Sequence, residues 1–141
     1  MTRFHHRPRR CELTGLVAGL RAHAQGVCAE IAAVELLIAH RFWLTRDDFR
    51  DQFVHHDSAP RTPGVAALAR VDWTGAAAAL ESGRLACSSG EGAVLHIAIA
   101  LATGGPFSAS VLTSLDRGNF AKVLTATVRA GGHTDANVAI R

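Results

Sequence analysis

The chain contains no tyrosine, only one methionine, and a single lysine, Lys122, among its 15 basic residues. Phenylalanine and tryptophan are also few, at six and two, so the core must be built mainly from alanine, leucine, valine and isoleucine. Small aliphatic side chains at this density let helices approach one another closely. We interpret the preference for arginine over lysine as genome composition, because Ala, Gly, Val and Arg all have GC-rich codons. The arginine content is therefore weak evidence for phosphate recognition.

Cysteine is scarce as well. Cys11, Cys28 and Cys87 are odd in number and widely spaced, which excludes a disulfide framework and a zinc ribbon. Cys28 and Cys87 lie within apolar helical patterns, so we expect buried free thiols and a reducing compartment. No uninterrupted apolar run approaches the roughly 20 residues needed to span a bilayer. The sequence therefore predicts a soluble, cytoplasmic protein with no membrane contact.

Positive charge is concentrated at the N-terminus. Residues 1–10 hold Arg3, Arg7, Arg9 and Arg10 and no acidic residue. Removing these four from the 15 basic residues leaves 11 against 12 acidic ones, so the rest of the chain is nearly neutral. This balance argues against a broad nucleic-acid-binding surface. We predict a flexible basic arm over residues 1–10.

The clearest pattern follows the arm, where apolar residues recur in alternating steps of four and three. This spacing predicts a helix with a heptad-like seam. The seam consists of Leu13, Val17, Leu20, Ala24, Val27, Ile31, Val34 and Ile38. One helix over residues 11–42 would be about 48 Å long, which exceeds the diameter of a small domain, so part of the seam would need a partner. Gly26 costs a helix about 1 kcal/mol relative to alanine and could instead divide the segment into a hairpin.

Later helices are predicted from polar residues that cap helix starts and glycines that end helices. The predicted caps are Thr45, Asp72, Ser88 with Ser89, Ser108 and Asp116, and the predicted ends include Gly83, Gly104 and Gly131. Phe49 and Phe53 share one face of the helix after Thr45. The stretch from Ala93 to Leu101 is apolar almost all round, which is typical of a central helix.

No segment alternates polar and apolar residues with a period of two, so we predict no sheet, and His55-His56-Asp57 is assigned to a loop. The predicted fold class is all-α: a single-domain bundle of about five to six helices with a long N-terminal heptad-like helix or a helical hairpin. The helical domain spans residues 11–135, and residues 136–141 form a tail.

Three stretches carry a resemblance to a known group. They are Glu35-Leu-Leu-Ile-Ala-His40 through Trp43-Leu-Thr-Arg-Asp-Asp-Phe49, Val71-Asp-Trp73 through Gly83-Arg-Leu-Ala-Cys-Ser-Ser-Gly-Glu91, and Leu115-Asp-Arg-Gly-Asn-Phe120. Together they resemble short helical proteins of high-GC Gram-positive bacteria for which no activity is known. The resemblance covers most of residues 27–133 in the same order. It implies a single helical domain and implies no substrate or catalytic residue.

Several polar residues can be interpreted either as functional groups or as ordinary structural ones. Free N–H groups after Ser88 and Ser89 could hold an anion, although serine at a helix start is usually only a cap. Adjacent His55 and His56 lack the spacing that places two metal ligands on one helix face. His96, in the most apolar helix, is expected to be a neutral core imidazole. Cys87 stands at a helix start, where the pKa of a thiol can fall.

The sequence shows no second motif that would complete a reaction site around these residues, so we predict no catalytic residue, cofactor or metal ligand. The leading hypothesis is a non-enzymatic helical interaction or regulatory protein that associates with itself, as a homodimer, or with a protein partner through the seam. The alternative is a nucleic-acid-binding regulator that uses the arginine-rich arm. A third hypothesis is a small enzyme or metal-binding protein centred on Cys87, His96 or His55-His56.

Overall fold

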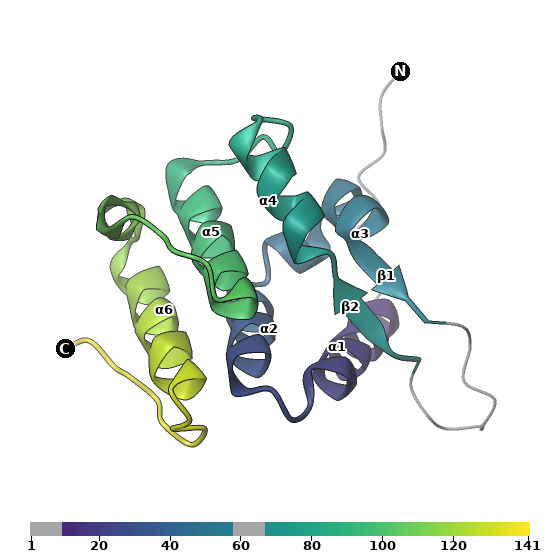
Figure 1. Ribbon diagram of the computed structural model, residues 1–141, viewed down its shortest axis with the longest axis horizontal. Helices are drawn as coiled ribbons and strands as arrows, with labels where there is room; N and C mark the ends of the chain where they lie inside the picture. Colours follow the sequence, from purple (N-terminus) through teal and green to yellow (C-terminus); the bar gives the residue numbers. More distant parts are fainter. Residues whose placement is uncertain (1–9, 58–66) are drawn as a thin grey trace.

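The computed structural model describes residues 10–57 and 67–141, and most of them are helical (Figure 1). The elements in chain order are α1 (Arg10–Ala24), α2 (Cys28–His40), the 3-10 turn η1 (Trp43–Thr45), α3 (Asp47–Phe53), β1 (Val54–His56), β2 (Ala69–Val71), α4 (Trp73–Glu81), α5 (Ser89–Thr103), the 3-10 segment η2 (Ala109–Ser114) and α6 (Arg117–Ala130). The predicted helical class is confirmed at this level.

The N-terminal seam folds as two helices rather than one. α1 ends at Ala24 and α2 begins at Cys28, and between them Gly26 adopts φ +92°, a conformation that suits glycine far better than other residues. α1 and α2 then pack against each other. Arg10, which the sequence assigned to the arm, is the first residue of α1, so the helix begins earlier than predicted.

The prediction that the chain has no sheet is wrong. β1 pairs with β2 in an antiparallel ribbon whose register aligns Val54 with Val71 and His56 with Ala69. Each strand has only three residues, too few to show a period-two pattern in the sequence. The two-stranded ribbon is stabilised by tertiary packing, because β2 packs against α1. A Cβ atom built on Gly19 of α1 would collide with the carbonyl oxygen of Ala67, so this close approach requires glycine.

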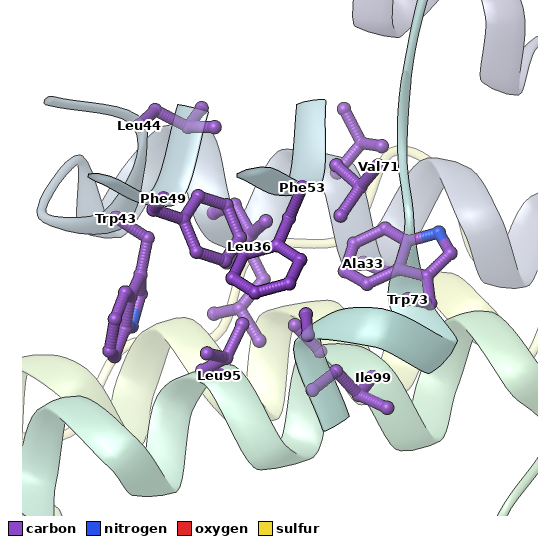
Figure 2. Close-up of a cluster of buried hydrophobic side chains, with 14 of the residues drawn as sticks. Ala33, Leu36, Trp43, Leu44, Phe49, Phe53, Val71, Trp73, Leu95 and Ile99 are labelled. Carbon is purple, nitrogen blue, oxygen red and sulfur yellow. The ribbon is translucent and has the colours of Figure 1, made fainter. Parts of the chain in front are cut away.

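The hydrophobic core lies between α2 and α5, with side chains from η1 and α3 inserted at one end (Figure 2). The rings of Trp43, Phe49 and Phe53 follow one another, with centroids 5.5 and 5.6 Å apart, and all three side chains are buried. Leu95 of α5 lies beside this row in Figure 2. Three of the aromatic side chains therefore form one row within the core, and alanine, leucine, valine and isoleucine fill most of the remaining core.

Most predicted caps are confirmed. The carboxylate of Asp72 accepts from the backbone N–H of Gly75 at 3.0 Å, and that of Asp116 accepts from Asn119 at 2.7 Å. Ser88 and Ser108 also cap the segments that follow them. The prediction for Thr45 is wrong, because its hydroxyl donates back to the carbonyl oxygen of Phe42 at 2.8 Å and closes η1. α3 starts one residue later.

The segment after α6 turns back along that helix (Figure 1). Arg129 donates from Nε to the carbonyl oxygen of Ala136 at 3.0 Å and from Nη2 to Oδ1 of Asn137 at 2.8 Å. The N–H of Val138 donates to the hydroxyl of Thr125 at 3.0 Å. The predicted tail over residues 136–141 is thus attached to α6 through residues 136–138.

Candidate functional site

The hairpin divides the eight seam residues into three environments. Leu20, Ala24 and Val34 are buried. Four others, Leu13, Val17, Ile31 and Ile38, are half-buried, and Val27 at the turn is 53% exposed. The seam therefore contributes side chains both to the core of the molecule and to its surface.

Two hollows lie along the crevice between α1 and α2. The first, about 420 Å³ in volume, is lined by Leu13, Val17 and Ile38 together with Leu44. The second, about 350 Å³, is lined by Ala24, Ile31 and Val34. The lining residues of each helix are spaced by three or four positions, so they occupy successive turns of one face. We name these two hollows together the hairpin groove, and six of the eight seam residues line it.

An ion pair lies on the hairpin groove. Arg21 of α1 donates from Nε and Nη2 to the two carboxylate oxygens of Glu35 of α2, at 2.6 and 3.1 Å. These hydrogen bonds raise the pKa of Arg21 further above its usual value. Arg21 and Glu35 both line the second hollow, and Arg21 falls between Val17 and Ala24 in helical register. A positive and a negative charge therefore stand side by side in a groove whose other lining residues are mainly aliphatic, with Thr14, Gln25 and Arg41 as its further polar members.

The predicted burial of the cysteines is wrong, since Cys28 and Cys87 are both exposed free thiols. Cys87 does stand just before α5, but its pKa is raised and not lowered. Partial desolvation is the main cause, the charge of Glu91 adds to it, and the charge of Arg46 opposes it. The thiolate that a nucleophile requires is therefore disfavoured at this position.

The candidate anion site at Ser88 and Ser89 lies at a helix start that the chain's own side chains cap. The hydroxyl of Ser88 accepts from the N–H of Glu91 at 3.2 Å, and the Glu91 carboxylate accepts from the N–H of Ser88 at 2.7 Å. This reciprocal arrangement is a capping box. The N–H groups of Ser88 and Glu91 are thus satisfied by the chain itself, and the Glu91 carboxylate places a negative charge at the helix start where an anion would have to bind.

The expectation that His96 is a core imidazole is also wrong. His96 is exposed and lines a hollow of about 450 Å³ between α4 and α5, together with Glu81 and Leu80. His55 and His56 are exposed on β1 rather than in a loop. Across residues 10–57 and 67–141, no three His, Cys, Asp or Glu side chains are grouped so that they could hold a metal ion.

Two features have no counterpart in the sequence predictions. The imidazole of His40 is half-buried, and its Nδ1 atom is buried without a hydrogen-bond partner. Burial is the main cause that lowers the pKa of His40; Lys122 lowers it further, whereas Glu91 and Asp116 oppose the shift. The second feature is a groove between α2 and α6. Both depend on residues far apart in the chain, which spacing within one helix does not reveal.

The remaining predicted residues, Arg3, Arg7 and Arg9 of the arm, lie outside the described residues. None of the helices in the described part of the chain is long and apolar enough to cross a membrane.

No protein-family model, curated protein or solved structure matches this chain.

Proposed function

We propose that this chain is a non-enzymatic helical interaction protein that forms a homodimer through the hairpin groove. The observation that carries the proposal is the outward-facing part of the seam. Leu13, Val17, Ile31 and Ile38 remain half-buried, and Val27 is largely exposed, although all belong to one regular apolar pattern. Apolar area left in contact with water favours association, at about 25 cal/mol for each Å² that becomes buried.

The charges in the groove favour a second copy of the same chain as the occupant. A two-fold symmetric interface places each surface patch against itself. A groove carrying charge of one sign at its centre would repel its copy. Arg21 and Glu35 lie next to each other, so a two-fold axis between them can bring Arg21 of one protomer close to Glu35 of the other. The aliphatic side chains of the two hollows would then cover one another.

A regulatory role in the cytoplasm fits this chemistry. The groove presents mainly aliphatic side chains, the Arg21–Glu35 ion pair and the exposed Arg41, groups that suit binding better than bond formation. The exposed free thiols of Cys28 and Cys87 support a reducing compartment.

Light scattering on variants tests the proposal. Val17→Glu introduces a charge into the groove, and Phe107→Glu introduces the same charge at a residue that is 37% exposed and lies outside the groove. The unchanged protein and Phe107→Glu are expected to have the mass of a dimer, and Val17→Glu that of a monomer with unchanged helical circular dichroism. A strictly monomeric unchanged protein at high micromolar concentration would contradict the proposal, as would a dimeric Val17→Glu variant.

The alternative function, nucleic-acid-binding regulation, is supported by the four arginines and absence of acidic residues in residues 1–10. Such an arm would release counterions from phosphates, so its affinity should fall as salt rises. Electrophoretic mobility shifts of duplex DNA or RNA, with and without residues 1–10 and across a salt series, test this role. A flat salt response, or equal binding by the truncated chain, would exclude the electrostatic mechanism.

A further inference from the structure

A groove between α2 and α6, with a volume of about 540 Å³, adjoins the hairpin groove and shares with it the lining residues Arg21, Glu35, Ile38 and Ala39. This volume lies within the usual range for small-molecule sites. Small residues line part of it, namely Ala32 and Ala39 of α2 and Gly118, Ala121 and Ala126 of α6, beside the larger Leu36, Ile38 and Val138. The lining of α6 runs from Gly118 to Arg129, which corresponds to about 16 Å of helix. The result is an elongated, largely apolar hollow.

Cations outnumber acids along this α2–α6 groove. It is lined by Arg21, Lys122 and Arg129 but by only one acid, Glu35. Glu35 is already engaged by both hydrogen bonds from Arg21. Arg129 is bonded to the carbonyl of Ala136 and the side-chain amide of Asn137, which are neutral groups and leave its charge uncompensated.

Lys122 is the second uncompensated charge. No carboxylate within the described part of the chain lies within 4.0 Å of its ammonium group, whereas Arg46 and Arg50 are paired with Asp48 and Asp47. The chain apart from residues 1–10 is almost neutral, so an excess of positive charge in one hollow is a local property. A cation beside an apolar surface is complementary to a ligand that combines an anionic group with an apolar chain.

We propose that the α2–α6 groove binds a small amphipathic organic anion, with its carboxylate or phosphate at Lys122 and its apolar chain along the alanine-lined floor. Arg129, held in place by the segment after α6, adds to the positive potential. The basic arm is an unsuitable occupant, because its four arginines would be repelled by the same charges. This proposal does not depend on self-association of the chain.

Titration of the full-length protein with dodecanoate, dodecyl phosphate and dodecanol, each below its micelle concentration, tests the site by calorimetry and by amide chemical shifts. Both anions should bind and shift amides of α2 and α6, and dodecanol should bind at least about tenfold more weakly, since a charge-assisted contact is lost. Anions that bind no better than dodecanol, or not at all, would overturn the proposal. Dodecanoate and dodecyl phosphate separate a carboxylate preference from a phosphate preference.

Variants locate the site. Lys122→Gln should weaken dodecanoate binding about tenfold or more, and Lys122→Arg should restore most of it. Ala121→Leu fills the groove without changing charge and should abolish binding.

Arg117→Gln is the control, because it removes one positive charge from an exposed position on α6 outside the groove lining. It should leave the affinity within about twofold. Equal losses for Arg117→Gln and Lys122→Gln would show that only net charge matters and would refute a specific site. Dodecanoate binding to the unchanged protein should also weaken as the salt concentration rises, and this measurement does not depend on any variant.

Discussion

The indole N–H of Trp43 donates a 3.0 Å hydrogen bond to the carbonyl oxygen of Glu91. This contact joins η1 to the first turn of α5, which are 48 residues apart in the chain, and Glu91 also completes the capping box of α5. The ring of Trp43 is at the same time fully buried beside Phe49. One residue therefore links the aromatic part of the core to the start of a central helix.

Trp43→Phe should lower the free energy of unfolding by about 1 kcal/mol for the lost hydrogen bond, with a further loss for the smaller ring. Trp73→Phe is the matched control, because the indole N–H of Trp73 is buried without a partner and its removal relieves an unsatisfied donor. Urea unfolding followed by circular dichroism measures both. An equal or larger loss for Trp73→Phe would show that the bond to Glu91 contributes little.

Ser88→Ala should cost about 1 kcal/mol, because it removes the hydroxyl that accepts from the N–H of Glu91. Ser89→Ala changes the neighbouring exposed residue, which is already within α5, and alanine is the better helix former there. Its stability should stay the same or rise slightly. Chemical unfolding of the two variants side by side checks the difference, and identical midpoints would remove the argument for the capping box.

The two glycines of α1 that lie one turn apart should respond in opposite directions. Gly15→Ala meets no atom within 4 Å and should stabilise α1 by up to about 1 kcal/mol. Gly19→Ala collides with the backbone of Ala67 and should destabilise the packing of β2 on α1 by about 1 to 3 kcal/mol. Thermal unfolding distinguishes them. A Gly19→Ala protein as stable as Gly15→Ala would contradict the close approach.

Stability should fall as the solution is acidified through the range in which His40 titrates. Burial, followed by the charge of Lys122, lowers the pKa of His40 in the folded protein below the ordinary value of about 6.5. The unfolded chain therefore binds a proton first, so the contribution of His40 is complete above pH 6.5 and is lost as the pH falls towards the folded pKa. His40→Gln should reduce this dependence, measured as urea midpoints between pH 7 and 5. An unaltered slope in His40→Gln would refute the assignment.

Features set by local chemistry could be predicted from the sequence. The caps at Asp72, Ser88 and Asp116 depend on a side chain and an N–H three residues further on, so their pattern lies within one turn. Phe49 and Phe53 were also expected on one face, and both are buried. The helical class follows from the same short-range periodicity.

Features that depend on distant contacts could not be predicted. β1 and β2 are three residues each and are stabilised by packing on α1, which a local pattern does not record. His96 lies in the most apolar helix, yet the face that carries it is left open beside α4. The seam pattern was correct in its spacing, but the turn at Gly26 directs some of its residues inward and leaves others at the surface.

Sedimentation velocity of the unchanged protein, from low to high micromolar concentration at physiological salt, tests the proposed self-association most directly. Burial of the hairpin groove between two copies predicts a sedimentation coefficient that rises with concentration and levels off at the value for twice the mass of one 14.9 kDa chain. A coefficient that stays at the single-chain value throughout that range would contradict it.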